Sequence, residues 1–151
     1  MPFIKIYVHF VWCTKNRVES LETKAIRDKV WFHIKENAKK KDIFVDFVNG
    51  YSQHCHCLVS LGVDQTISKI MQLIKGESSH WINKEGLTKE KFEWQDEYWG
   101  VSVSESMIET VRNYIKNQEI HHGTHSFEDE IDELIRRHGF QKFEDEENKS
   151  G

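Results

Sequence analysis

Hydrophobic residues alternate with polar ones in some stretches of the chain, which is typical of strands, and recur at helical spacing in others. In the first segment every second residue is apolar and would share one face of a strand: Ile4, Ile6, Val8, Phe10 and Trp12. Residues 42–48 are rich in β-branched and aromatic side chains and predict a second strand that ends at the turn signal Asn49-Gly50. We expect a third strand over residues 54–61 and a fourth, interrupted strand within residues 92–104.

Helical spacing fills the intervals between these strands. Ile26, Val30 and Ile34 are spaced by four, with Ala38 continuing the stripe, and predict a helix before residue 42. Thr66 can cap a second helix. Its expected apolar face consists of Ile67, Ile70, Met71, Ile74, Trp81 and Ile82, with Gly76 as a weak point inside the helix.

Two further helices are expected in the last third of the chain. The first follows Ser104 or Ser106 and would bury Ile108, Val111 and Ile115. The second starts with a capping box of Ser126 and Asp129, carries an apolar stripe, and can end at Gly139. The resulting order, β-α-β-β-α-β-α with an extra C-terminal helix, predicts an α+β fold of the ferredoxin-like type, a two-layer sandwich.

Composition favours one globular domain in a reducing compartment. The chain has 151 residues, of which 38% are hydrophobic and 30% charged, as is usual for soluble domains. No apolar run approaches the roughly 20 residues that a membrane helix needs, and residues 1–12 lack the basic lead of a signal peptide. Cys13, Cys55 and Cys57 are an odd set without a disulfide framework, so we expect a cytoplasmic protein.

The charge is distributed unevenly around a net value of −4. Residues 126–151 hold nine acids against four bases, a net of −5, which leaves +1 for the rest of the chain. We therefore divide the chain into a domain at residues 1–122 and a C-terminal amphipathic helix with an acidic tail at residues 123–151. Residues 15–41 hold nine bases and four acids, which suits either phosphate binding or a solvated helix face.

His54-Cys55-His56-Cys57 is the first candidate for chemistry. Side chains alternate along a strand, so both imidazoles would lie on one face and both thiols on the other. Two histidines roughly 6.6 Å apart at Cα can lean toward one metal ion and leave coordination positions open. The same pattern is also compatible with two half-buried histidines bonded to neighbours. A zinc site with the thiols is less favoured, because the thiols lie on the opposite face.

Tyr114 and Gln118 are the second candidate. They are four residues apart on the third expected helix, so their side chains would lie on the same helix face, beside the apolar stripe. Taken alone, Tyr114 is better explained as a tyrosine at the edge of the core whose hydroxyl is hydrogen-bonded. His121, His122 and His125 follow, and histidines at a helix end need no metal.

Together these segments resemble the HUH-type single-tyrosine transposases of small bacterial insertion sequences and their REP-associated relatives. Five blocks carry the resemblance in the family's order: HFVWCTKNR from residue 9, QHCHCLVSL from residue 53, ISKIMQLIKGESSHWIN from residue 67, WQDEYWGVSVS from residue 94 and YIKNQEIHH from residue 114. Each block is weak evidence alone, and the ordered set is specific. Glu97 departs from the family, where a glycine is expected.

The resemblance implies a metal-dependent enzyme that cuts and rejoins single-stranded, hairpin-containing DNA through a 5′-phosphotyrosine. It implies that Tyr114 is the nucleophile, that His54, His56 and Gln118 bind Mg²⁺ or Mn²⁺, and that a homodimer forms composite active sites. Lys15, Arg17, Lys69 and Lys75 are our candidates for DNA binding.

Three alternatives remain open at this point. The chain could be a domesticated relative that acts on chromosomal hairpins without mobility. It could instead be a non-catalytic module that binds single-stranded nucleic acid, or a small metal-dependent hydrolase that uses water as its nucleophile.

Overall fold

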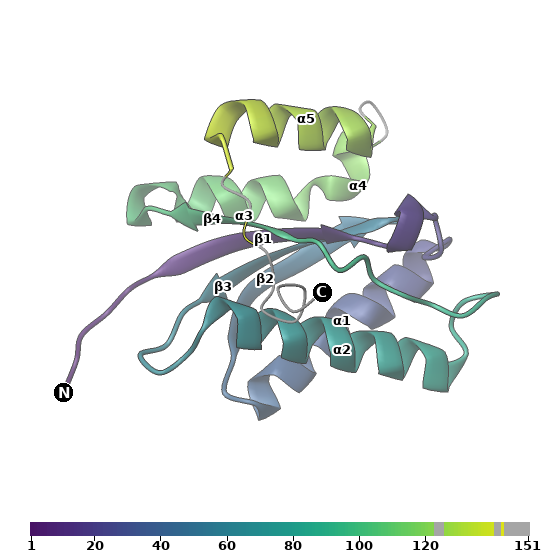
Figure 1. Ribbon diagram of the computed structural model, residues 1–151, viewed down its shortest axis with the longest axis horizontal. Helices are drawn as coiled ribbons and strands as arrows, with labels where there is room; N and C mark the ends of the chain where they lie inside the picture. The colour runs from purple at the N-terminus through teal and green to yellow at the C-terminus, as the bar shows by residue number, and fades with distance from the viewer. Residues whose placement is uncertain (123–125, 141–142, 144–151) are drawn as a thin grey trace.

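A four-stranded antiparallel sheet forms the centre of the computed structural model, which describes residues 1–122, 126–140 and 143 (Figure 1). Its strands are β1 (Tyr7–Cys13), β2 (Phe44–Tyr51), β3 (His54–Ser60) and β4 (Trp99–Val103), in the order β2-β3-β1-β4. Helix α1 (Lys24–Lys40) connects β1 to β2, and α2 (Ile67–Glu85) connects β3 to β4. This order of elements and the mixed α+β class agree with the prediction from the sequence.

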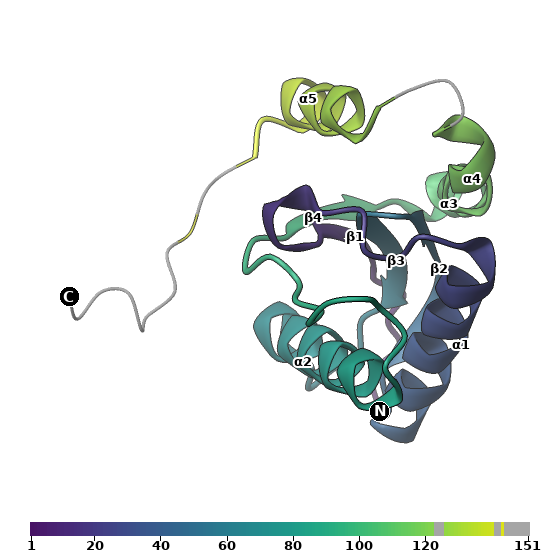
Figure 2. The same ribbon diagram turned by 90° about the vertical axis from the view of Figure 1, so that its right-hand side faces the viewer.

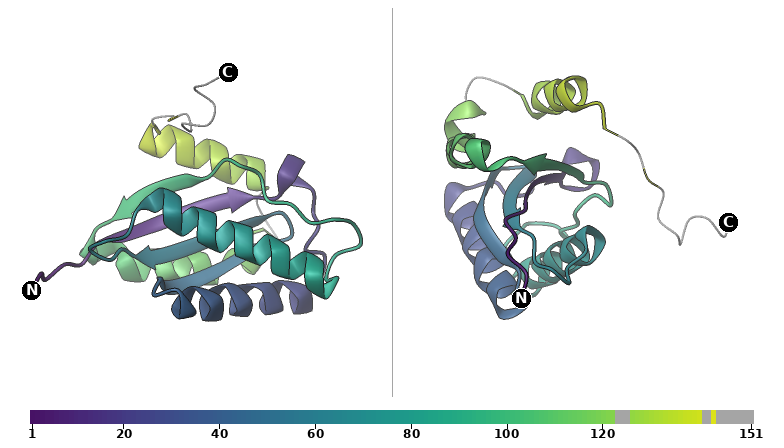
Figure 3. Two further views of the ribbon diagram at one scale, coloured as in Figure 1. Left: turned by 60° about the horizontal axis from the view of Figure 1, so that its bottom comes forward. Right: turned by 90° about the vertical axis from the view of Figure 1, so that its left-hand side faces the viewer.

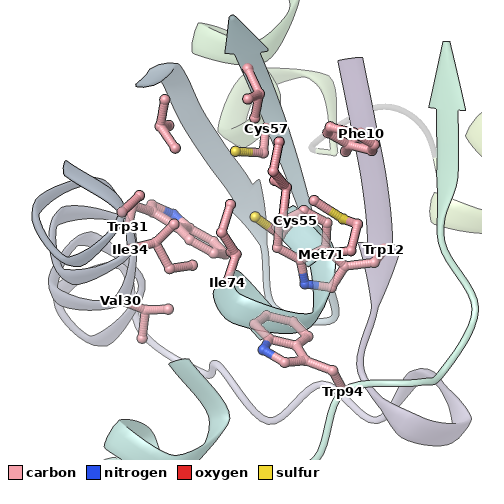
Figure 4. Packing of buried hydrophobic residues seen from close by; sticks show 14 of the residues in the cluster. Phe10, Trp12, Val30, Trp31, Ile34, Cys55, Cys57, Met71, Ile74 and Trp94 are labelled. Atoms are coloured by element: carbon pink, nitrogen blue, oxygen red, sulfur yellow. The ribbon is translucent and has the colours of Figure 1, made fainter. Parts of the chain in front are cut away.

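The helices α1 and α2 cover one face of the sheet and bury the main core against it (Figure 3). Phe10 and Trp12 of β1 point into this core, as does Cys55 of β3 (Figure 4). Cys57 also lies there, and burial raises the pKa of its thiol well above the usual range. Both cysteines of β3 therefore act as small apolar side chains, on the face that the alternation predicted.

Three helices lie on the other face of the sheet: α3 (Ile108–Lys116), α4 (Gln118–His121) and α5 (Phe127–His138) (Figure 2). Ile108 and Ile115 of α3 pack against Leu58 of β3. Phe127 and Ile131 of α5 pack against Val11 and Cys13 of β1. The sheet is thus covered on both faces, which adds a third layer to the two that we expected. No helix in the described part of the chain is long and apolar enough to span a membrane.

The first and last strands are shorter than the patterns suggested. Ile4 and Ile6 are 46% and 47% exposed and precede β1, whose pairing with β3 and β4 starts at Tyr7. Before β4, the stretch that begins at Phe92 is irregular, and its Trp94 forms an isolated bridge with Thr14. The last helix starts and stops as predicted: the Ser126 side chain accepts a hydrogen bond from the Asp129 backbone, and Gly139 adopts a left-handed conformation.

Asn49-Gly50 lies inside β2 and is not the turn that we predicted. The hairpin turn is formed by Ser52 and Gln53, two residues later. Gly50 is needed for another reason, because a Cβ atom there would lie 2.1 Å from the backbone oxygen of His54. The missing side chain lets β2 approach β3 closely at the start of the histidine strand.

This close approach makes Gly50→Ala destabilising. The added methyl would push β2 away from β3, and we expect the free energy of unfolding to fall by about 1–3 kcal/mol, measured by urea denaturation. Gly76→Ala in α2 is the matched control, because no atom lies within 4 Å of its added methyl and alanine favours helix by up to about 1 kcal/mol. Equal stability of the two variants would contradict this view of Gly50.

Candidate active site

His54 and His56 lie side by side on the sheet face that α3, α4 and α5 cover. Both are fully buried, and their ring centroids are 5.1 Å apart. His54 Nδ1 is 3.2 Å from Gln53 Oε1, and His56 Nδ1 is 2.9 Å from His9 Nε2. These contacts hold the Nδ1 side of each ring and leave both Nε2 atoms directed at the centre of the site.

The tyrosine helix brings Tyr114 and Gln118 to this pair. Gln118 Oε1 is 3.0 Å from His54 Nε2, and the Tyr114 ring lies edge-on to His56 with 5.5 Å between centroids. The expected single helix is divided at Asn117, where α3 ends and α4 begins. Gln118 is nevertheless fully buried, and Tyr114 is half-buried at the edge of the site. One chain therefore brings together all four residues predicted from the sequence.

Polar contacts fix the tyrosine helix on the sheet. Arg112 of α3 forms two hydrogen bonds to the Asp46 carboxylate of β2, at 2.6 and 2.5 Å. Asn49 Nδ2 donates to the carbonyl oxygens of Ile115 and Lys116 at the end of α3. Asn49 pairs with His56 across the two strands, so the same strand that adjoins the histidines also holds the helix.

Glu130 of α5 is a site residue that the sequence analysis missed. Its carboxylate accepts a hydrogen bond from the Tyr114 hydroxyl and lies 2.6 Å from His56 Nε2 and 2.6 Å from His122 Nε2. A signal was present: Glu130 falls between Phe127 and Ile131 on the apolar stripe of its helix. A charged residue in that place is buried when the stripe packs.

The buried carboxylate changes the acid–base properties of the site. Burial alone would raise the pKa of the Glu130 carboxyl, but its contacts with His122 and His56 outweigh burial and hold the pKa well below its usual range. Burial and the charge of Glu130 both raise the pKa of the Tyr114 hydroxyl. Burial lowers the pKa of His54 and lowers that of His9 to about 3, so both imidazoles are neutral near pH 7.

The donor atoms in this site fit a divalent cation. His54, His122 and Glu130 each offer one ligand atom, and these atoms lie within 4.8 Å of one another. His56 Nε2 is buried and has no hydrogen-bond partner among the residues that the structure describes, although Glu130 Oε1 is near it. Neutral imidazole nitrogens and carboxylate or amide oxygens are ligands for first-row divalent metals.

A cleft of about 1090 Å³ gives access to the tyrosine. It runs between β4 and α3 on one side and α5 on the other, with Tyr114 and Glu130 in its wall. Arg136 and Arg137 line it at the end of α5, together with hydroxyl groups such as that of Ser102. Asp129, Glu130, Asp132 and Glu133 also line the cleft, so side chains of both charges border the route to Tyr114.

The four predicted DNA-binding residues occupy different surroundings. Lys15 pairs with Glu93 at 3.2 Å, and Arg17 lies over the Phe127 ring at 5.4 Å, near the site. Lys69 is exposed on α2, on the opposite side of the sheet from the histidines. Lys75 donates to the carbonyl oxygens of Gln95 and Asp96 and so holds the segment before β4. A role of any of the four in DNA binding remains a prediction.

Removing the Glu130 charge should lower the pKa of Tyr114. A nearby negative charge disfavours tyrosinate, so Glu130→Gln should move the titration of Tyr114 to lower pH. The measurement is the ¹³C chemical shift of the labelled tyrosine ring against pH, with the Tyr114 signal assigned by its loss in Tyr114→Phe. Asp132→Asn, on the exposed side of the same helix, is the control. A titration unchanged in Glu130→Gln would show that the two groups are not coupled.

Comparisons with known proteins agree with this geometry. A family model described as IS200-like transposase matches residues 3–118. No curated protein matches the sequence. Two solved structures share the fold, each at 20% sequence identity. A transposase candidate from Deinococcus radiodurans has a TM-score of 0.62, with 78% of this chain and 93% of that chain covered. A REP-associated tyrosine transposase bound to a REP hairpin has a TM-score of 0.60, with coverage of 82% and 72%.

Proposed function

Because the chain belongs to the family of IS200-like transposases, we propose that it cuts and rejoins single-stranded DNA through a covalent bond to Tyr114. The observation that carries this proposal is the meeting of Tyr114 with His54 and His56 in one buried site. A nucleophile beside a group of metal-binding side chains is what phosphoryl transfer requires. The cleft along α3 and α5 supports a polymeric substrate.

The proposed reaction is an exchange of phosphoester bonds. The Tyr114 hydroxyl loses its proton and its oxygen forms a bond to phosphorus, while the bond from phosphorus to the 3′ oxygen breaks. The 3′ oxygen takes up a proton and leaves as a hydroxyl, and the 5′ end stays joined to Tyr114. Because the phosphoester bond is conserved in this linkage, attack by a 3′-hydroxyl rejoins strands without another energy source.

His54, His56 and Gln118 are the proposed ligands of Mg²⁺ or Mn²⁺. His54 Nε2 is 3.0 Å from Gln118 Oε1, and the ring centroids of His54 and His56 are 5.1 Å apart. The bound cation supplies Lewis-acid stabilisation of charge on the phosphate oxygens. Imidazole favours Mn²⁺ over Mg²⁺, so we expect tighter binding of Mn²⁺ to the isolated protein.

The proposed substrate is single-stranded DNA that contains a hairpin. One structural neighbour is a transposase bound to a REP hairpin. In this chain Lys15 and Arg17 project from the exposed 3₁₀ turn η1 (Lys15–Arg17) after β1, where they can reach phosphates beside the site. A domesticated nuclease without mobility would use the same site, and the flanking genomic DNA distinguishes it from a mobile transposase.

The covalent step gives the sharpest test. Wild-type protein incubated with a single-stranded hairpin and Mn²⁺ should form a protein–DNA species that survives denaturation, detected by gel electrophoresis and mapped to Tyr114 by mass spectrometry. Tyr114→Phe removes one oxygen, so it should bind the hairpin as wild type does and form no adduct. Tyr7→Phe, on β1, keeps the nucleophile and should leave adduct formation unchanged.

Other outcomes favour the alternative functions. Cleavage by Tyr114→Phe at the wild-type rate would mean that water is the nucleophile and that the protein is a hydrolase. Tight hairpin binding without adduct or cleavage in the wild type would favour the non-catalytic binding module. Either result would exclude the proposed mechanism.

The composite homodimer expected from the family resemblance remains a prediction. The alternative is an active site formed within a single chain. Tyr114 already lies beside His56 of its own chain. If composite sites form as the resemblance implies, mixing Tyr114→Phe protein with His56→Ala protein under conditions of subunit exchange should restore some cleavage, whereas sites formed within one chain should restore none. Recovery of cleavage would establish composite sites, because the mixed dimer then holds one intact pair of Tyr114 and His56. Light scattering of both variants checks that they share one oligomeric state.

A further inference from the structure

The centre of the candidate active site holds a carboxylate that the proposed ligand set does not use. Glu130 is 5% exposed, and Phe127 and Ile131 on either side of it are buried against β1. Phe127 stacks on His54 with 4.3 Å between ring centroids. The position of Glu130 is therefore fixed by apolar packing of α5 on the sheet, and its carboxylate is held among the histidines by that packing.

In the part of the chain that the structure describes, no lysine or arginine forms an ion pair with the Glu130 carboxylate. Its ion-pair partners in the described part of the chain are four histidines: His54, His56, His121 and His122. A buried carboxylate is costly unless a positive group or several hydrogen bonds compensate it. Tyr114 and Gln118 each donate one hydrogen bond, and His122 Nε2 forms a third at 2.6 Å, while the surrounding imidazoles add positive charge only when they are protonated.

The distances around Glu130 are within about 1 Å of those between ligands that share one ion. Two ligands about 2.1 Å from a metal are about 3.0 to 3.4 Å apart when they subtend octahedral or tetrahedral angles. Glu130 Oε1 is 2.6 Å from His56 Nε2, and Oε2 is 2.6 Å from His122 Nε2 and 3.7 Å from His54 Nε2. Shifts of under 1 Å would make these separations equal to coordination distances.

The alignment at His56 supports the same conclusion. Its Nε2 lies 2.6 Å from Glu130 Oε1, yet it lacks a hydrogen-bond partner among the described residues because the ring nitrogen and the oxygen are not aligned for one. A cation between His56 Nε2 and Glu130 Oε1 would bind both atoms. The two atoms would then need no hydrogen bond to each other.

We propose that Glu130 and His122 are further ligands of the divalent cation, so that the C-terminal helix supplies a carboxylate to the metal centre. This inference rests on the metal site of the proposed function. His54, His56 and Gln118 would fill about half of the six positions of an octahedral ion. Glu130 and His122 would fill two more and leave one for a phosphate oxygen of the substrate.

The assignment has a structural consequence. Because α5 provides a ligand, cation binding and the docking of α5 on the sheet stabilise each other, as any ligand stabilises the state that binds it. The carboxylate also gives Mg²⁺ a hard oxygen ligand that the imidazoles do not provide. The cation thus connects two segments that are far apart in the chain, β3 and α5.

Calorimetric titration of the full chain with Mn²⁺ tests the assignment. Even residues behind metal ligands cost about 10–100-fold in affinity when mutated, so we expect Glu130→Gln to weaken Mn²⁺ binding by about tenfold or more. His122→Ala should also weaken it. Asp132→Asn removes a charge from the exposed side of α5 and should change affinity by less than about twofold, since it is screened by solvent.

Amide hydrogen exchange gives a second measurement. Mn²⁺ should slow exchange in residues 127–138 of wild type and of Asp132→Asn, and should have no such effect in Glu130→Gln. This comparison also reveals whether α5 is folded in each variant before the metal is added.

The outcomes separate this inference from the proposed function. If Glu130→Gln binds Mn²⁺ as tightly as wild type, or more tightly, Glu130 is not a ligand and the inference is overturned. If the double variant His54→Ala, His56→Ala loses Mn²⁺ binding in that case, the metal site of the proposed function is still supported. If the wild type itself binds no Mn²⁺, both the inference and the proposed metal dependence are wrong.

Discussion

The alternation of side chains along β3 is the constraint on which both the core and the site depend. β3 is an inner strand, paired with β1 and β2, so each of its residues faces one layer of helices or the other. Cys55 and Cys57 fill the core under α1 and α2, while His54 and His56 face the opposite layer. A shift of one residue in register would exchange these sets and bury two imidazoles in the apolar core.

Polar contacts add to the apolar packing that holds the second layer of helices on the sheet. The pair of Arg112 and Asp46 fixes α3 on β2, and Arg27 of α1 forms two hydrogen bonds to Glu119 of α4 around the sheet edge. Each pair is partly or largely buried, so removal of one partner leaves a charge with little solvent. The tyrosine helix is therefore fixed relative to the histidine strand by groups that are not themselves reactive.

Sequence periodicity predicted the elements of this fold well because local spacing decides which side of a strand or helix is buried. It succeeded for β3 and for the capped helix α5, and it placed His54 with His56 and Tyr114 with Gln118 on shared faces, whereas the family resemblance brought the two pairs together. It failed where distant contacts decide. The close approach of β2 to the His54 backbone explains Gly50 better than a turn does, and no local pattern contains that distance. The burial of Glu130 could have been predicted, because it is an acid on an apolar stripe. Its partners could not, because they come from β3 and α3.

One carboxylate thus affects both the nucleophile and the proposed metal ligands. While its charge is not neutralised, Glu130 raises the pKa of the Tyr114 hydroxyl and favours the protonated, unreactive form. If a cation binds the carboxylate as proposed, it would offset that charge and would also reduce the repulsion that an incoming phosphodiester meets in the site. Occupation of the metal centre would therefore favour substrate binding and tyrosine ionisation through the same electrostatic change. Because Glu130 belongs to α5, the proposed coupling would make the reactivity of Tyr114 depend on whether the C-terminal helix is docked.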